Sequence, residues 1–440
     1  MAITAAGVGS GLDIASIVNQ LVSAERAPVQ SRISAARAKV NTQISALGAL
    51  KGALSNLKSK LSALGPGKQL EAVAATSSSS ETFTAVAGKG AAAGSYDVEV
   101  VALAKAHKLV SQAYSGGANT VLGNGTVEIS VGGQAFTVTL SDGHNTLGSL
   151  RDAINASQDN TGVTATLIND QDGARLLLTA KKTGTDNQIV LNTALFTMSE
   201  QQAAANAQVR IEGYDVYSQS NTVTGAVDGV TLTLYRPSDG QTGTLTIARD
   251  SGAGKSAIED FVKAYNAVVS VVVSQTRYDA EAKKASTFTG DAAVRGVMQT
   301  LRGIAGGAAE SGELTTLAEL GIKTKTDGTL EIDSSRLTDV LSAKANAVTA
   351  LFSGDGGIAT RLSAAIDQLV KPGGTLDAKS NSLNANLKDL SVQQEALDRR
   401  IDGLQERYQK QFAGLDSLLG QMNATSSYLS QQLSSLSKLR

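Results

Sequence analysis

The sequence contains no cysteine and no tryptophan, and only two of its 440 residues are histidine. Without cysteine the chain cannot form a disulfide scaffold, a thiolate nucleophile or a zinc site with sulfur ligands. His107 stands in an alternating stretch and His144 beside a turn, and neither has an Asp or Ser at catalytic spacing. We therefore expect no enzyme activity, no cofactor and no metal site.

Long apolar runs and a strong net charge are also absent. The longest strongly apolar run, 267–273, is far shorter than the ~20 residues that span a bilayer. A formal net charge of −1 creates no strong field for nucleic acid or a membrane surface, so we expect neither partner. The first residues lack the features of a Sec-type signal, so any export is expected to proceed without a cleaved signal.

Two short motifs suggest ligands but match them incompletely. Gly252-Ala-Gly-Lys-Ser256 has Arg249 where a phosphate-binding loop needs its first glycine, and Ser256 with Glu259 has the spacing of a helix capping box. Asp170-Gln-Asp-Gly173 lacks the later ligands of a calcium loop and is interpreted as a turn. Nucleotide hydrolysis is kept only as a distant alternative.

Apolar residues recur every seven positions at both ends of the chain. In 383–439 they occupy two seam positions, interrupted by Gln394, Tyr408, Gln411, Thr425 and Gln432, and a second series runs through 33–64. Such a repeat is typical of coiled-coil helices, which need a partner in water. The seam residues expected to pair are Val40, Leu47, Leu54, Leu61, Leu390, Leu397, Ile401 and Leu404.

Between these helices the period changes to the alternation of β-strands. The clearest hairpin joins 127–131 to 135–140 through Gly132-Gly133, because both glycines tolerate positive φ. Helical patterns return at Ser256 and continue to Leu369. The sequence therefore predicts an α+β fold, in which the terminal heptad helices form an antiparallel coiled-coil and helical-bundle stalk with two inserted antiparallel β-rich head domains.

The expected boundaries follow from these changes of period. The N-terminal half comprises a flexible leg (1–30), a stalk helix (31–75) and a first head domain (76–109 and 205–250) that encloses a second (110–204). The remainder comprises a helical bundle (251–375), a stalk helix (376–410) and a C-terminal leg (411–440). Glycines and polar interruptions from 403 onward indicate that this last leg is disordered until a chaperone, a neighbouring subunit or flagellin supplies a groove.

Several ordered motifs resemble one family. Gly9-Ser-Gly-Leu-Asp13 with the following Ile17-Val18, Gly94–Ala104 and Phe261–Asn266 are similar to conserved segments of the flagellar filament cap, or FliD, family (hook-associated protein type 2). Residues 126–192 resemble the flagellin IN module of axial flagellar proteins.

The resemblance implies a homo-oligomeric ring at the extracellular tip of a bacterial flagellum, which helps flagellin to insert and fold and prevents its leakage. It also implies export by the flagellar type III route, with hook–filament junction proteins and a cytoplasmic export chaperone as further partners. The matching leg residues, expected to bind partners, are Asp13, Ile14, Ile17, Val18, Leu21, Leu415, Leu418, Met422, Leu429 and Leu436.

An adhesin is the alternative from another functional class. The ends of the chain are basic, with +5 in 1–75 and +1 in 376–440, so the total of −1 leaves −7 for the middle. An acidic head could bind host glycan or mucin while the stalk only anchors it. A deletion strain that leaks flagellin would support the cap, and normal filaments would favour the adhesin.

Overall fold

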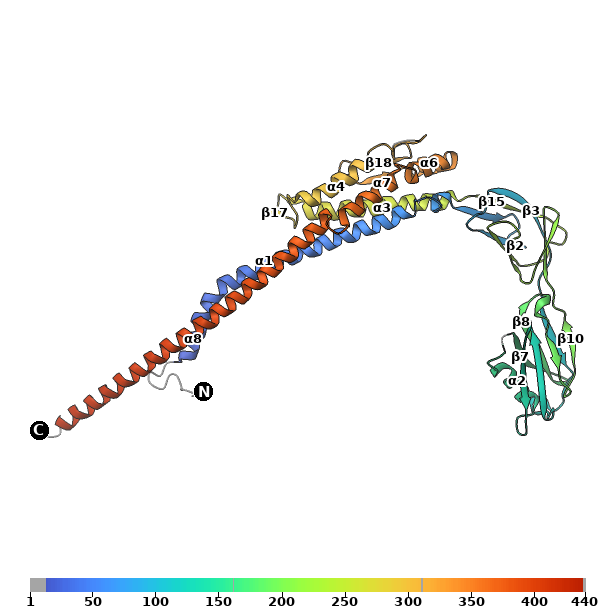
Figure 1. Cartoon of the computed structure of the whole chain (residues 1–440), viewed down its shortest axis with the longest axis horizontal. Helices are drawn as coiled ribbons and strands as arrows, with labels where there is room; N and C mark the ends of the chain where they lie inside the picture. The colour runs from blue at the N-terminus through green and yellow to red at the C-terminus, as the bar shows by residue number, and fades with distance from the viewer. Residues whose placement is uncertain (1–12, 161, 310–311, 438–440) are drawn as a thin grey trace. The chain divides into compact units, whose positions relative to one another are not determined.

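The computed structural model describes residues 13–160, 162–309 and 312–437, with side chains to residue 434 (Figure 1). Its contacts divide the chain into two compact units. The helical unit comprises the chain up to Leu70 and from Ser251 onward, and the β unit comprises Glu71–Asp250. The predicted fold class is confirmed, since terminal helices enclose inserted antiparallel sheets.

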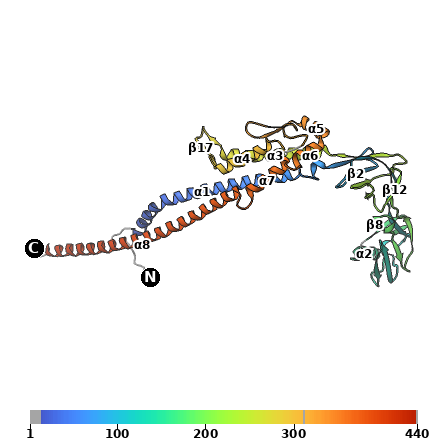
Figure 2. The ribbon, with the colours of Figure 1, turned by 45° about the horizontal axis from the view of Figure 1, so that its top comes forward.

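The helical unit contains two long helices and five shorter ones within the described residues. The long ones are α1 (Ile14–Ser62) and α8 (Thr375–Ser437), which lie side by side in both views of the ribbon (Figures 1 and 2). The shorter ones are α3 (Ser251–Thr276), α4 (Ala292–Ala305), α5 (Ser334–Ala343), α6 (Ala345–Ser353) and α7 (Ile358–Val370). Two small hairpins join them, β16–β17 (Tyr278–Asp279, Lys284–Ala285) and β18–β19 (Ile322–Thr324, Leu330–Ile332).

One apolar core, which we call the main core, holds most of this unit together. Leu47, Leu54 and Leu61 of α1 are buried there with residues of α3, α4, α6 and α7, among them Phe261 and Phe352. The two rings meet edge to face at 5.9 Å between centroids, a favourable geometry for aromatic pairs. None of the helices that the structure describes is long and apolar enough to cross a membrane.

In the first β-rich domain two sheets face each other. One has the order β1 (Val73–Ser77), β15 (Gly243–Arg249), β3 (Gly94–Ala102), β11 (Ala207–Ile211), β12 (Tyr214–Ser218). The other has the order β13 (Thr222–Thr224), β14 (Val230–Leu234), β2 (Phe83–Ala87). Because side chains alternate along a strand, every second residue enters the shared core, including Phe83, Val98 and Leu232.

The second β-rich domain is inserted between β3 and β11. One sheet has the order β10 (Met198–Gln202), β4 (Ala106–Ser111), β8 (Gly173–Thr183), β7 (Val163–Asp170). The other has the order β6 (Gln134–Leu140), β5 (Gly125–Val131), β9 (Val190–Asn192), and α2 (Leu147–Ala156) contributes Leu150 and Ile154 to the core. The β5–β6 hairpin turns through Gly132 and Gly133 at φ of 58° and 76°, as their sequence indicates.

Several element boundaries differ from the sequence-based expectation. The N-terminal stalk helix ends at Ser62, and 73–77 form strand β1, which pairs with β15. Strand β4 belongs to the second β-rich domain because it pairs with β8 and β10. Helix α3 begins at Ser251, so the expected N-cap at Ser256 is wrong, and Gly252–Ser256 form its first turns rather than a phosphate loop.

Candidate interaction site on the terminal helices

Helices α1 and α8 pair in antiparallel orientation, as their polar contacts show. Glu25 accepts a hydrogen bond from Arg400 at 2.9 Å, and further along α1 Arg37 donates one to Ser391 at 3.3 Å. Facing residue numbers thus rise on α1 while they fall on α8. Because α8 begins only at Thr375, the C-terminal end of α1 packs against α7 and α3 instead, with ion pairs from Lys58 to Asp367 and from Lys60 to Asp260.

The first half of α1 meets α8 in a small separate core. Its buried members are Ile14, Val18, Val22 and Ile33 of α1 with Leu397 and Ile401 of α8. Leu404, Tyr408 and Phe412 pack against it while partly exposed. Asp13 caps the helix, since its carboxylate accepts a hydrogen bond from the Ser16 backbone N–H at 3.0 Å. We call this cluster the distal core.

Pro28 lies within α1, which continues through it, although a flexible leg was expected over 1–30. A proline removes one internal hydrogen bond, because its nitrogen carries no hydrogen. Helix α1 contacts α8 on both sides of Pro28. Arg26 forms an ion pair with Asp398, and Gln30 forms a hydrogen bond with Gln394. Residues 1–12 of the expected leg lie outside the described residues.

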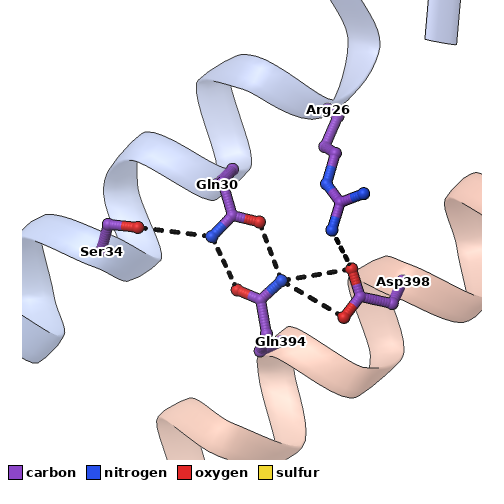
Figure 3. Close-up of polar contacts among 5 residues, drawn as sticks. All are labelled: Arg26, Gln30, Ser34, Gln394 and Asp398. Atoms are coloured by element: carbon purple, nitrogen blue, oxygen red, sulfur yellow. Dashed lines mark hydrogen bonds and ion pairs between the residues drawn. The ribbon is translucent and has the colours of Figure 1, made fainter. Parts of the chain in front are cut away.

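A polar layer lies beside the distal core, between Val22 and Ile33 along α1 (Figure 3). The amides of Gln30 and Gln394 bind each other reciprocally, at 2.9 and 2.8 Å, and Gln394 also donates to Asp398 at 3.2 Å. Arg26 forms an ion pair with the same carboxylate. Paired amides satisfy each other only when the two helices stand in one register, so the layer specifies how α1 and α8 align.

Beyond Phe412, α8 exposes an apolar stripe. Within the described residues α8 runs on past the start of α1, as both ribbon views show (Figures 1 and 2). The exposed side chains are Leu415, Leu418, Met422, Leu429 and Leu433, each 53–67 % exposed. Isolated apolar residues on a surface need no explanation, but a continuous stripe on one helix marks a binding surface.

The predicted site residues fall into three groups. The seam residues Val40, Leu47, Leu54 and Leu61 are buried in the main core, with Leu390 partly buried against it. Leu397, Ile401 and Leu404 face 14–33 of α1, most of which was expected to belong to the flexible leg 1–30. The pairing of α1 with α8 therefore begins earlier in the chain than expected, because the register set at Gln30 and Gln394 brings Ile14 into the distal core.

The predicted partner-binding residues differ in their exposure. Ile14 and Val18 are buried in the distal core, so their apolar surface is already used within the chain. Ile17 is half-buried, Asp13 is exposed but caps the helix, and Leu21 is 42 % exposed. The side chain of Leu436 lies outside the described part of the chain. The expected disorder of the leg from 411 is not seen, since α8 stays helical through Ser437.

Sequence reasoning missed two contributions to this site. Tyr408 and Gln394 were noted only as interruptions of the apolar seam, yet one packs against the distal core and the other forms the polar layer. The signal for the second was present, because Gln30 and Gln394 are both amides on heptad helices. Only the register, which a single sequence does not define, brings them together.

The other sequence motifs have structural roles. Lys255 donates a hydrogen bond to Thr338 at 3.0 Å, and Asp170 binds Arg175 at 2.7 Å across the β7–β8 turn. His107 is buried and accepts a hydrogen bond from the Ile189 backbone N–H at 3.0 Å. Among the described residues no group of three or more His, Cys, Asp or Glu side chains could hold a metal ion.

Coiled-coil terminal helices with an exposed apolar stripe enclose inserted β-domains. Comparison with known proteins gives the family. The flagellar hook-associated protein 2 C-terminus model matches residues 204–424, the N-terminus model matches 10–107, and the flagellin hook IN motif matches 126–182.

Relatives and a solved structure agree. The chain is 34 % identical to an A-type flagellar hook-associated protein 2 of Pseudomonas aeruginosa, over 98 % of this chain and 97 % of that protein. It is 32 % identical to flagellar hook-associated protein 2 of Escherichia coli, over 98 % of each. The D1-D2-D3 crystal structure of the flagellar cap protein FliD from Escherichia coli superposes with a TM-score of 0.63 at 30 % identity, covering 77 % of this chain and 99 % of that one.

The chain belongs to the FliD family, the flagellar hook-associated protein 2 or flagellar cap proteins. The family resemblance seen in the sequence is thereby confirmed.

Proposed function

We propose that this protein caps the tip of a growing flagellar filament as a homo-oligomeric ring, and that it promotes the insertion and folding of exported flagellin while preventing its leakage. The observation that carries the proposal is the apolar stripe of α8 beyond Phe412, which the described residues leave uncovered. An amphipathic helix with one apolar face binds by laying that face in a groove.

The stripe can bind several partners in succession, provided that each offers an apolar groove. An export chaperone in the cytoplasm, then a neighbouring subunit, a hook–filament junction protein or flagellin at the tip, would each supply an apolar groove. Because the stripe is mostly Leu and Met on a single helix, the contacts require little specific geometry, and Met adapts to grooves of different shape. Transit through the flagellar type III route without a cleaved signal is part of this proposal.

The test uses a strain lacking this protein, complemented with Leu418→Asp. The matched control is Val392→Asp, on the same helix and 54 % exposed against 57 % for Leu418, but outside the stripe. We expect Leu418→Asp to release monomeric flagellin into the medium, while Val392→Asp restores filaments. Normal filaments with Leu418→Asp would remove the stripe from the mechanism.

The same strains test the adhesin alternative. No specific feature of the described head domains supports an adhesin. If the strain without this protein grows normal filaments, the cap proposal fails. Loss of binding to purified mucin in that strain would then favour the adhesin.

A further inference from the structure

A hollow of about 500 Å³ opens where the edges of the two sheets of the second β-rich domain come together. It is lined by residues of β4 and β10 from one sheet, by β9 from the other, and by the loop between β9 and β10. The sheet orders place β9 and β10 at the edges of their sheets, so none of the described strands closes the hollow on this side. Its volume falls within the range of pockets that hold small molecules, roughly 300–1,000 Å³.

The buried ring of His107 forms the polar floor of this hollow and is fixed at both nitrogens. Its Nδ1 accepts a hydrogen bond from the Ile189 backbone N–H at 3.0 Å, so the ring proton lies on Nε2. Nε2 then donates to a carboxylate oxygen of Glu200, also at 3.0 Å. Since both nitrogens are occupied, His107 contributes by holding the Glu200 carboxylate at the rim of the hollow.

Glu200 brings a single negative charge to this hollow. Its side chain is 51 % exposed, and within the part of the chain that the structure describes no Lys or Arg forms an ion pair with it. None of the other residues that line the hollow carries a charge while His107 stays neutral. A carboxylate can accept several hydrogen bonds, so Glu200 retains the capacity to bind a cation besides its bond from His107.

Apolar side chains form much of the wall beside this charge. They are Leu109, Leu191, Phe196 and Met198. An inorganic cation at Glu200 would leave this apolar surface in contact with water, and an anion would be repelled by the carboxylate. A molecule with an apolar body and one ammonium group satisfies both features at once, and the flexible thioether of Met198 can adapt to bodies of different shape.

We propose that this hollow binds a small organic cation, in which a protonated amine is attached to an aromatic or aliphatic body. The ammonium group donates a charge-assisted hydrogen bond to Glu200, and the body packs against Leu191, Phe196 and Met198. The site shares no residue with the apolar stripe of α8. Ligand binding here is therefore independent of the capping proposal, and either can fail without the other.

The test uses methionine methyl groups as reporters in the full chain. The sequence contains four methionines, so labelling them with 13C at the methyl group gives a nuclear magnetic resonance spectrum with few signals. Met198 lines the hollow, Met298 is buried in the main core and Met422 belongs to the α8 stripe, which provides one reporter and two internal controls. The probe is 2-phenylethylamine, and 3-phenylpropionate is the matched compound with a carboxylate in place of the ammonium. We expect the amine to shift the Met198 signal saturably and the carboxylate to leave it in place.

Two variants test the role of the charge. Glu200→Gln removes the charge but keeps an oxygen that can accept the hydrogen bond from His107. The control is Glu128→Gln, an exposed carboxylate of the same domain that does not line the hollow. We expect Glu200→Gln to weaken binding of the amine at least tenfold and Glu128→Gln to bind it like wild type.

Four outcomes would overturn the proposal. They are a Met198 signal that the amine does not move, a shift confined to Met422, equal binding of 3-phenylpropionate, and undiminished binding by Glu200→Gln. A shift confined to Met422 would assign the amine to the stripe of α8 instead.

Discussion

Gln30 and Gln394 show how two residues align two long helices. Aliphatic residues form the surrounding seam, and their contacts tolerate a shift of one heptad because the same pattern recurs seven residues later. The reciprocal amide bonds, at 2.8 and 2.9 Å, form in one alignment only. The glutamine layer therefore contributes specificity at some cost in apolar contact.

Replacing Gln394 alone by Leu should destabilise the α1–α8 pair by about 1 kcal/mol, because Gln30 and Asp398 lose their hydrogen bonds with Gln394. The double variant Gln30→Leu/Gln394→Leu should recover that loss, since two leucines complete the seam. Thermal melting followed by circular dichroism measures both. A double variant as unstable as the sum of the two single ones would contradict the coupling.

Register is tested separately with cysteines, which the natural chain lacks. Arg37→Cys with Ser391→Cys replaces two side chains that already bind each other at 3.3 Å. A crosslink between the two cysteines, made by a thiol-reactive reagent of about the length of the Arg37 side chain, should form in high yield in the presence of both glutamines. Its yield should fall in the double-leucine background, where shifted alignments compete.

Asp291 is a second residue with a measurable role, at the junction of α4 and α8. Burial acts to raise the pKa of its carboxyl, but the ion pair with Lys379 at 2.6 Å and the backbone hydrogen bonds from Val294 and Ala293 outweigh it. The pKa is therefore lowered from its ordinary value of 3.8. Lys379 also lies 5.9 Å from the centre of the Phe288 ring.

A lowered pKa makes the contribution of Asp291 dependent on pH. The stabilisation is fully present above the unfolded pKa near 3.8 and is lost as the pH falls through the lower folded value. We expect Asp291→Asn to lower the melting temperature of the helical unit at pH 7 and to differ less from wild type below pH ~3.5. A difference independent of pH would show that the ion pair contributes nothing.

At the scale of elements, α8 has a packed N-terminal part and an exposed C-terminal part. Up to Phe412 its seam residues pack against α1 and the shorter helices, whereas beyond Phe412 they are exposed in the described residues. Heptads continue through both halves, so periodicity alone does not separate them. The difference lies in where α1 begins.

This division predicts that replacing a leucine by aspartate has a small effect on stability beyond Phe412 and a large one before it. Leu418→Asp should change the free energy of unfolding by less than about 0.5 kcal/mol, because Leu418 is 57 % exposed. Leu397→Asp, which places a carboxylate in the distal core, should cost more than about 2 kcal/mol in the pairing of α1 and α8. Chemical denaturation of the two variants checks this, and equal losses would contradict the assignment.

Truncation after Phe412 extends the test to the whole exposed half. We expect the truncated protein to retain the melting temperature of wild type but to fail in capping, because the distal core remains and the stripe is gone. Circular dichroism and filament assembly in the deletion strain measure the two properties. Retained capping would show that the stripe is dispensable.

At the scale of the molecule, the chain passes between its two units twice, after Leu70 and after Asp250. The Asp250 backbone N–H donates to the Ala72 carbonyl at 2.8 Å where both strands leave the β unit, and β1 pairs with β15 beside it. Each unit has buried cores of its own. Because the two ends of the inserted β unit lie next to each other, this unit can fold without the helical unit.

We therefore expect the fragment 71–250 to fold alone. Its far-ultraviolet circular dichroism should show β-structure and a cooperative thermal transition, and the full chain should show the same transition beside that of the helices. The distal core and main core should melt unchanged when β-unit residues are destabilised, for instance by Leu232→Ala, which removes a buried side chain. A fragment without a cooperative transition would contradict the independence of the units.

The sequence alone determined the period of each segment, and thereby the helical ends, the inserted sheets and the Gly132-Gly133 hairpin, because periodicity and turn chemistry are local properties. Tertiary structure decided the rest. The facing of 14–33 with Leu397 and Ile401, the layer of Gln30 and Gln394, and the beginning of the exposed stripe after Phe412 all depend on the register between segments over 360 residues apart. A heptad repeat is compatible with many such registers, and only the packing of the whole unit selects one.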